Sequence, residues 1–268
     1  MIKIENLTCG YDNTILENIN LSISQNKITF IIGQNGSGKS TLGNILTGLK
    51  KDFKGKITIN NQEINKKTSI INLRKLISMV FQNPNNQILF TSVYDDIKFT
   101  LENINTNPKE IENIIKESLK KVNLLDKINS NPYNLSGGEK QRLAIASILA
   151  LNPKYIVFDE ATSMLDINNR QEIYELIKVL NKNNIGIICI TNIMDELTIA
   201  DEILIIDNKK IFKYTKEELL NNISILTNHH LNIPLSLKII NILRNKGNSI
   251  NNENDILKIL NNLWLLLL

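Results

Sequence analysis

Apolar residues along the chain alternate between the two-residue repeat of strands and the wider repeat of helices. Residues 2–7 alternate apolar and polar side chains, which predicts an edge strand, and residues 19–23 predict a second strand. Residues 28–32 form a continuous apolar run that ends in glycine, as expected of a strand buried on both faces. Residues 39–49 predict a helix that follows this strand closely.

Strand and helix patterns continue to alternate toward the C-terminus. Strands are predicted at residues 56–60, 77–81, 155–158, 185–191 and 203–207, and a helix at 171–180. Ile111, Ile115 and Leu119 fall at helix spacing, so residues 92–150 predict a helical subdomain inserted into the sheet domain. The alternation predicts an α/β fold, a mostly parallel sheet covered by helices.

The pattern changes at about residue 214. Short helices are predicted at residues 217–227, 234–244 and 256–268, which divides the chain into a sheet domain at 1–214 and a helical C-terminal extension at 215–268. No run of about twenty apolar residues occurs, so no membrane span is expected. The first residues also lack the apolar core of a signal peptide.

Composition narrows the class of protein. Of the 268 residues, 42% are hydrophobic and 22% are charged, as in ordinary globular proteins. The net charge is +4 and the basic residues are scattered, so we interpret them as solvated surface and expect no nucleic-acid partner. Cys9 and Cys189 lie far apart without metal-ligand spacing, which favours a reducing compartment over a disulfide.

A glycine-rich loop lies between the apolar strand at 28–32 and the following helix. Its sequence fits the phosphate-loop pattern G-x-x-x-x-G-K-[ST]. Gly36 and Gly38 allow close approach to phosphate oxygens, and the helix N-terminus favours negative charge. Lys39 places a positive charge at the β- and γ-phosphates, and the Ser40 hydroxyl suits Mg²⁺. The predicted nucleoside triphosphate site comprises Gly33, Gln34, Asn35, Gly36, Ser37, Gly38, Lys39, Ser40 and Thr41.

Two adjacent carboxylates, Asp159 and Glu160, close the apolar strand predicted at 155–158. The strand end would hold the Asp159 carboxylate near the expected Mg²⁺, and Glu160 can polarise the attacking water. Two carboxylates at a strand end can also be a helix cap, and the residues alone leave this alternative open.

Residues 135–142 read Leu-Ser-Gly-Gly-Glu-Lys-Gln-Arg. With the phosphate loop before it and the acidic pair after it, this octapeptide resembles the signature of the ATP-binding-cassette (ABC) ATPases, the motors of ABC transporters. The resemblance covers about residues 2–214. It implies a P-loop NTPase fold of the ABC-ATPase type, with a mixed sheet, a RecA-like core, the inserted helical subdomain and the short helical extension.

The resemblance also implies the cofactors, ATP and Mg²⁺, and roles for further residues. Ser136, Gly137 and Gly138 would clamp the γ-phosphate of ATP held by a second ABC ATPase, so two chains pair head to tail. An ordinary N-cap at Ser136 explains Ser-Gly-Gly but not the whole octapeptide. Asp166 would be the aspartate that crosses the dimer, and Tyr11 would stack on adenine. The implied metal ligands are Ser40, Gln82 and Asp159, and the implied catalytic residues are Glu160, Gln82 and Asn192.

Asn192 departs from the family pattern, which usually has a histidine at this position. Asparagine can hydrogen-bond a phosphate oxygen but cannot become cationic. We therefore expect slow hydrolysis at the chain's own phosphate loop, unless asparagine substitutes adequately. A heterodimer is favoured over a homodimer, since a partner that retains histidine would supply most turnover.

Residues 83–103 resemble the ATPases of energy-coupling factor (ECF) importers, which take up vitamins and metal ions such as cobalt and nickel. In that group the segment helps to form a groove for a helix of the membrane subunit. Ile88, Leu89 and Phe90 are candidates to line it, with an ordinary core role as the alternative. The short extension at 215–268 also suits this group, whose ATPases dimerise through a small helical tail.

The resemblance implies an ATPase coupled to transport, docked on the cytoplasmic face of the cell membrane. Its partners would be a second ABC ATPase, a transmembrane coupling subunit and a substrate-binding membrane subunit. Three alternatives remain: another ABC importer or exporter, a non-transport ATPase of DNA repair or translation, and a nucleotide-gated subunit that hydrolyses slowly because of Asn192. Long coiled-coil insertions and second cassettes, usual in non-transport relatives, are absent from the sequence.

Overall fold

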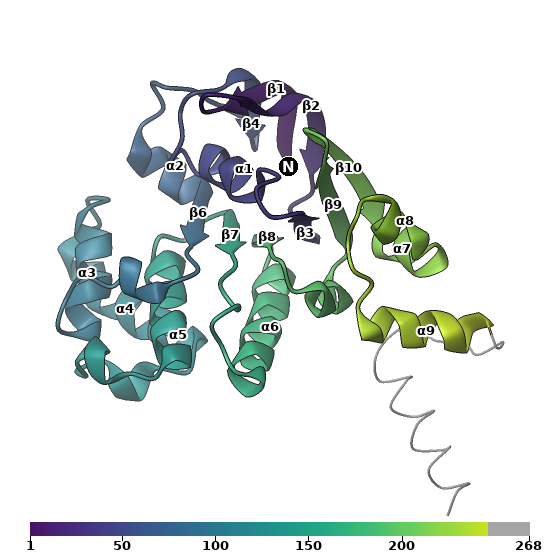
Figure 1. The fold of residues 1–268 in the computed structure, drawn as a ribbon. Coiled ribbons are helices and arrows are strands. Elements are labelled where there is room, and N and C mark those ends of the chain that lie inside the picture. The colour runs from purple at the N-terminus through teal and green to yellow at the C-terminus, as the bar shows by residue number, and fades with distance from the viewer. Residues whose placement is uncertain (246–268) are drawn as a thin grey trace, which may run out of the picture.

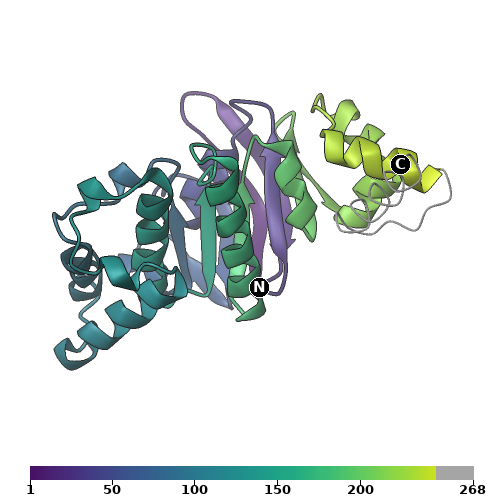
Figure 2. The ribbon, with the colours of Figure 1, turned by 90° about the horizontal axis from the view of Figure 1, so that it is seen from below.

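The computed structural model describes residues 1–245. Two β-sheets lie in the middle of the molecule, with the helices α3–α5 at one end and the helices α7–α9 at the other (Figures 1 and 2). None of the helices in this described part has the length and apolar character needed to cross a membrane.

The larger sheet has six strands in the order β10-β9-β3-β8-β7-β6, and all neighbours are parallel except β9 and β10. Its parallel strands are short apolar runs, as predicted, because both of their faces are buried. The carboxyl ends of these strands share one edge. The strands are β3 (Ile28–Gly33), β6 (Ile77–Val80), β7 (Tyr155–Asp159), β8 (Gly186–Ile190), β9 (Glu202–Asp207) and β10 (Lys210–Thr215).

The smaller sheet has four antiparallel strands in the order β2-β1-β4-β5. The prediction that residues 2–7 form an edge strand is wrong, because β1 lies between β2 and β4. Alternation of apolar residues reports which face is buried and not how many strands pair with the segment. The strands are β1 (Ile2–Gly10), β2 (Thr14–Ile23), β4 (Lys54–Ile59) and β5 (Gln62–Ile64).

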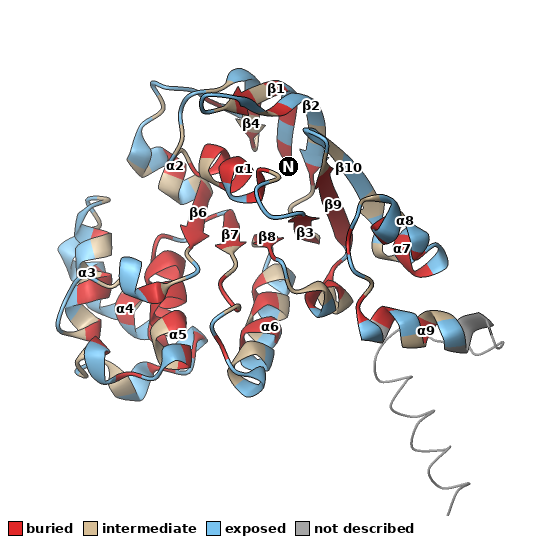
Figure 3. Ribbon diagram, in the orientation of Figure 1, coloured by how far each residue is buried: buried red, intermediate tan, exposed pale blue. Residues whose placement is uncertain are grey.

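The helices fill both faces of the larger sheet. The first half of the chain supplies α1 (Lys39–Leu46), α2 (Ile70–Leu76), α3 (Val93–Glu102) and α4 (Pro108–Lys121). The second half supplies α5 (Gly137–Ala150), α6 (Ile167–Lys182), α7 (Lys216–Asn221), α8 (Ser224–Asn228) and α9 (Leu235–Asn245). Helix α5 is buried over most of its length, whereas α6 has an exposed side (Figure 3).

Two hydrophobic cores lie on opposite faces of the larger sheet. Phe30 and Phe158 belong to the core shared with α5 and α6, and Ile31 and Val157 to the core shared with α1 and the smaller sheet. Successive strand residues thus point to opposite cores, which explains why both strands are continuously apolar.

The C-terminal helices differ from the prediction in one place. Residues 217–227 form two short helices, α7 and α8, because the backbone of Asn222 leaves the helical region at φ −140°. His229, just after α8, packs back on the sheet: its Nδ1 lies 3.0 Å from Asp207 Oδ2 and its Nε2 lies 3.1 Å from the Tyr214 hydroxyl. The helix predicted at 256–268 lies outside the described residues.

Candidate functional site

The phosphate loop joins β3 to α1 and keeps its backbone N–H groups accessible through two left-handed glycines. Gly36 has φ 78° and Gly38 has φ 108°, conformations that favour glycine. The Lys39 ammonium donates to the Gly33 carbonyl at 2.8 Å and to the Gln34 carbonyl at 2.9 Å, so it lies inside the loop. Burial lowers the pKa of Lys39, and the nearby carboxylates Glu160 and Asp159 oppose that shift.

A cavity of about 260 Å³ opens above this loop. Ile15 of the β1–β2 hairpin forms one wall and packs against the loop, since a Cβ at Gly38 would lie 2.5 Å from Ile15 Cγ2. The cavity brings together residues from β2, the phosphate loop and the ends of β7 and β8. Its lining is Ile15, Asn35, Gly36, Gly38, Lys39, Ser40, Thr41, Glu160 and Asn192.

Ser40 and Asp159 lie side by side at this edge. The Ser40 hydroxyl donates to Asp159 Oδ1 at 3.1 Å. Burial raises the pKa of Asp159, an effect that the Ser40 hydrogen bond opposes. These are hard oxygen donors of the kind that Mg²⁺ accepts beside phosphate and water, so the pair fits a Mg²⁺ ion.

Glu160 follows Asp159 in an unusual backbone conformation. Its φ is 50°, in the left-handed region that side chains other than asparagine rarely adopt. Its N–H donates to the Ile190 carbonyl at 2.9 Å, which ties it to the end of β8. The carboxylate accepts from two side-chain amides, Asn192 Nδ2 on one oxygen and Gln82 Nε2, at 3.1 Å, on the other. Three predicted catalytic residues therefore meet in one cluster.

Gln82 connects this cluster to the helical subdomain. Its Nε2 also donates to Ser163 Oγ at 3.2 Å, and Ser163 Oγ in turn donates to the Glu160 carbonyl at 2.8 Å. The preceding carbonyl, of Phe81, accepts from Gln141 Nε2 of α5 at 3.3 Å. The Nε2 group of Gln82 is thus held against Glu160, the residue that follows Asp159, and the role of Gln82 as a metal ligand stays a prediction.

The signature residues begin helix α5 with a capping box. The Ser136 hydroxyl accepts from the Glu139 N–H at 3.2 Å, and the Glu139 carboxylate accepts from the Ser136 N–H at 2.8 Å. That backbone hydrogen bond holds the pKa of Glu139 below its usual value. Within residues 1–245 no signature residue lines the phosphate cavity, so the chain's own signature does not complete its own site.

Gly137 and Gly138 have opposite surroundings. A Cβ at Gly137 would meet nothing within 4 Å, whereas a Cβ at Gly138 would lie 1.9 Å from Asn169 Oδ1. Asn169 in turn caps α6 with Asp166, donating from its backbone N–H at 2.9 Å and from Nδ2 at 2.6 Å. Gly138 therefore makes room for a contact between the signature helix and the Asp166 turn.

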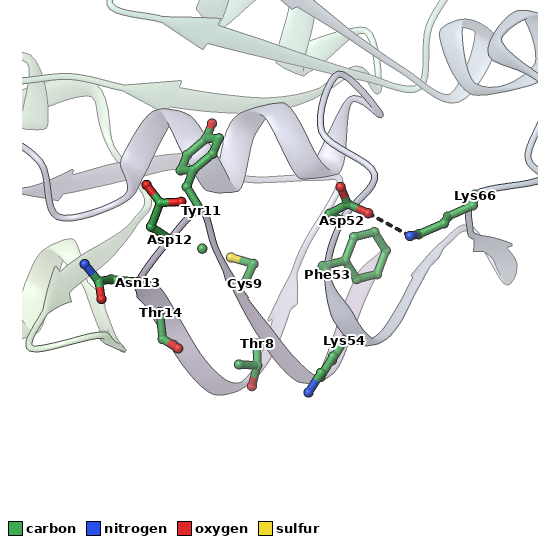
Figure 4. Close-up of a pocket in the computed structure, with 11 residues that line it drawn as sticks. Thr8, Cys9, Tyr11, Asp12, Asn13, Thr14, Asp52, Phe53, Lys54 and Lys66 are labelled. Atoms are coloured by element: carbon green, nitrogen blue, oxygen red, sulfur yellow. Dashed lines mark hydrogen bonds and ion pairs between the residues drawn. The ribbon is translucent and has the colours of Figure 1, made fainter.

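Tyr11 lies outside the phosphate cavity. Its side chain is 68% exposed, and the Lys50 ammonium sits 3.8 Å from the ring centroid. The ring lies at the rim of a second cavity of about 410 Å³, which also includes Phe53 and the Asp52–Lys66 ion pair (Figure 4). The ring is accessible from solvent, as the predicted stacking on adenine requires.

Leu89 and Phe90 belong to an exposed apolar surface rather than to the core. Leu89 is 68% exposed, and Phe90 packs on Phe99 at a centroid distance of 4.9 Å. The buried Asp96 carboxylate shapes this turn, since it accepts from the Leu89 N–H at 2.8 Å and from the Phe90 N–H at 3.3 Å. Ile88 alone of the three candidates packs against the core.

Several residues that support the site were not found from the sequence. Ser163, Asn169 and Glu196 act through contacts between segments far apart in the chain, and none belongs to a spaced motif. Ile15 is part of an alternating strand and carries no separate signal.

Comparison with known proteins identifies the family to which these motifs belong. The ABC transporter profile matches residues 16–163. The chain is 39% identical to the energy-coupling factor transporter ATP-binding protein EcfA1 of Clostridioides difficile, over 97% of this chain and 95% of that protein. The chain belongs to the ABC transporter family. The protein of the same name from Fusobacterium nucleatum is 40% identical over 95% of this chain and 94% of its own length.

Solved structures agree with this assignment. The structure of cbiO1 from Clostridium perfringens, described as part of the ABC transporter complex cbiONQ, matches with a TM-score of 0.77 at 30% identity, covering 89% of this chain and 98% of that one. The dimeric cassette MJ0796 bound to ADP and Pi matches with a TM-score of 0.70 at 28% identity, covering 81% and 99%. The predicted resemblance, the ABC-ATPase fold, the binding of ATP and an ATPase activity coupled to transport are confirmed.

Proposed function

We propose that this chain is the ATPase subunit of an energy-coupling factor importer that energises uptake of a vitamin or transition-metal ion. It would sit as a peripheral protein on the cytoplasmic face of the cell membrane. The names of the relatives support the importer type. The observation that carries the catalytic part is the cluster in which Asn192 and Gln82 hold both oxygens of Glu160 beside the phosphate loop.

ATP would lie with its triphosphate in the loop at 33–41. Lys39 and the loop N–H groups hold the β- and γ-phosphates, and Ser40 and Asp159 would hold Mg²⁺. Bound Mg²⁺ neutralises charge that develops on the phosphate oxygens. Gln82 would contribute its carbonyl oxygen Oε1 to this centre, while its Nε2 donates to Glu160. Tyr11 would offer its exposed ring to adenine.

Glu160 would take a proton from the attacking water. Hydrogen bonds to both of its oxygens orient the carboxylate before ATP arrives, and such preorganisation is a large part of catalysis. Asn192 has two N–H donors: one is occupied by Glu160 and the other remains for a phosphate oxygen. The site keeps its geometry but lacks the positive charge of a protonated histidine, so it should be slow and not inactive.

A second ATPase would complete each site. The signature residues Ser136, Gly137 and Gly138 do not reach the chain's own cavity, which supports a head-to-tail pair in which they clamp the partner's ATP. The structure of the matching cassette MJ0796 is dimeric. We favour a heterodimer, in which a histidine-bearing partner supplies most turnover. The extension at 215–268 would contribute to the pairing, with Asp166 crossing between the chains.

The exposed surface formed by Leu89, Phe90 and Phe99 would receive a helix of the transmembrane coupling subunit. A substrate-binding membrane subunit would complete the importer. Exposed aromatic and aliphatic side chains held by a buried carboxylate are suited to an apolar helix face. The transported solute would bind to the membrane partners and not to this chain.

The first test is purification of the tagged chain from its native membrane, with mass spectrometry of the proteins bound to it. We expect a second cassette ATPase with the histidine and two kinds of membrane subunit. Recovery with only itself and an unrelated permease would refute the heterodimeric ECF assignment.

The role of Asn192 has its own test in the purified complex. Asn192→His should raise ATP turnover at this chain's site about a hundredfold, the lower end of what a positioned acid–base group contributes. Glu160→Gln in the same complex is the control that should abolish turnover there. An unchanged rate for Asn192→His would show that the neutral amide is sufficient.

A nucleotide-gated role without useful turnover is the second candidate function, and Asn192 is the observation that favours it. Steady hydrolysis that disappears with Glu160→Gln would exclude it.

A further inference from the structure

Glu196 is a buried carboxylate that the proposed mechanism does not use. It lies in the 3₁₀ helix η4 (Met194–Ile199) and is only 3% exposed. One carboxylate oxygen, Oε1, accepts from the Thr162 hydroxyl and, at 2.8 Å, from the Tyr174 hydroxyl. Burying a carboxyl group is costly, and the two hydroxyl donors to this oxygen offset part of that cost.

We propose that Glu196 is a positioning residue for ATP hydrolysis, acting through Thr162 on the backbone of Glu160. The inference rests on the proposed role of Glu160 as the base. Glu196 does not line the phosphate cavity, so within the described residues it has no direct route to ATP.

The positions of Thr162 and Glu196 in the sequence explain how their hydrogen bond acts on Glu160. Thr162 lies two residues after Glu160, and Glu196 lies four residues after Asn192. The Thr162–Glu196 hydrogen bond therefore joins the segment that carries the base to the segment that carries its amide partner. Tyr174 connects the same carboxylate to α6, which fixes it against a rigid element.

The backbone of Glu160 needs such support. Its left-handed φ of 50° is unfavourable for glutamate and persists only where surrounding contacts hold it. The Glu160 N–H is held by the Ile190 carbonyl, and its carbonyl is held by Ser163. Thr162 lies between those two anchors, and its hydroxyl donates to the Glu196 carboxylate. Loss of this contact should let the turn relax and move the Glu160 carboxylate.

The test compares two Thr→Val variants, each of which removes one buried threonine hydroxyl. Thr162→Val removes the donor to Glu196, whose oxygen keeps the Tyr174 donor. Thr47→Val removes a donor to the Gly43 carbonyl, which keeps the Thr47 N–H donor at 3.0 Å. Thr47 is also fully buried and lies at the far end of α1 from the phosphate loop.

Turnover and nucleotide binding are measured in the assembled transporter, with the second ATPase's own catalytic carboxylate replaced so that hydrolysis at this chain's loop is observed. Thr162→Val should lower kcat about tenfold or more, since small displacements of a catalytic group are costly, and leave the KM for ATP unchanged. Thr47→Val should change melting temperature by a similar amount and leave kcat unchanged. Glu196→Ala should reproduce Thr162→Val, and Glu196→Gln, which keeps an acceptor oxygen, should restore part of the rate.

Equal kcat values for the two Thr→Val variants would overturn the inference, as would a fall in kcat matched by weaker ATP binding. Glu160→Gln separates this failure from a failure of the proposed function. If Glu160→Gln retains turnover, the base assignment itself is wrong. If it abolishes turnover while Thr162→Val is normal, only the role of Glu196 is wrong.

Discussion

Adding one methyl group to either signature glycine should have opposite effects on stability. In Gly138→Ala the new Cβ would lie 1.9 Å from Asn169 Oδ1 and 3.1 Å from Asn169 Cβ, so the Asn169 side chain must rotate away. It then loses the hydrogen bond from its Nδ2 to Asp166 and the 3.5 Å contact that its Oδ1 accepts from Arg142. Gly137→Ala meets nothing within 4 Å.

The magnitudes follow from these contacts. Each lost hydrogen bond costs about 0.5–1.5 kcal/mol net, so Gly138→Ala loses about 1–3 kcal/mol at Asn169. Alanine in place of glycine in a helix returns about 0.5–1 kcal/mol, and Gly137→Ala receives this gain without a loss. The two variants should therefore differ by about 2 kcal/mol in free energy of unfolding, or about 4–8 °C in melting temperature.

Thermal and urea unfolding of the isolated chain measure this difference. ATP turnover in the assembled complex should rank the variants differently from stability, since Gly137→Ala places a methyl group where the proposal puts the partner's triphosphate. Gly137→Ala should thus be stable and slow. A Gly138→Ala chain as stable as Gly137→Ala would refute the steric reasoning at Asn169.

Two further predictions concern carboxylates. The pKa of Glu139 is lowered in the folded chain, so its stabilising effect is complete above the ordinary carboxyl range and is lost as the pH falls through the lowered value. Glu139→Gln should be less stable than the wild type at pH 7, and the gap should close on acidification, as urea midpoints across pH would show. Asp96→Ala should free the Leu89 and Phe90 N–H groups and weaken binding of the coupling subunit in pull-downs, while hydrolysis by the isolated ATPase pair continues. The exposed neighbour Asp95→Ala is the control, and equal binding of both variants would contradict the docking role.

The elements that the sequence predicted best are those with strong hydrophobic patterns. Strands β3, β7 and β8 are continuous apolar runs, and each was located to within about two residues at its ends. The strand β10 was missed because it is largely exposed, with no buried residue to mark it. Helix α2 was also missed, since only Leu73 of its seven residues is buried and no periodic stripe results.

The candidate site likewise contains some contacts that the sequence predicts and others that it does not. The proximity of Lys39, Ser40 and Asp159 can be predicted from the sequence. The phosphate-loop pattern includes Lys39 and Ser40, and Asp159 ends a strand whose carboxyl end lies at the same edge of a parallel sheet. The partners of Gln82 could not, since Ser163 and Glu160 approach it across 81 and 78 residues through single polar groups. The Thr162–Glu196 contact had no sequence signal, because an isolated glutamate resembles an ordinary surface residue until its burial is known.

The phosphate loop and the signature segment are separated in this chain but joined by contacts. Gln141 is five residues after Ser136 on the signature helix α5, and its side chain holds the Phe81 carbonyl next to Gln82. Gln82 in turn holds the Glu160 carboxylate at the chain's own phosphate loop. In the proposed head-to-tail pair, a shift of α5 on contact of the signature with the partner's ATP would therefore be transmitted to Glu160, the proposed base. Such a connection gives a physical basis for coupling between the two ATP sites of a pair, because one rigid helix bears on both.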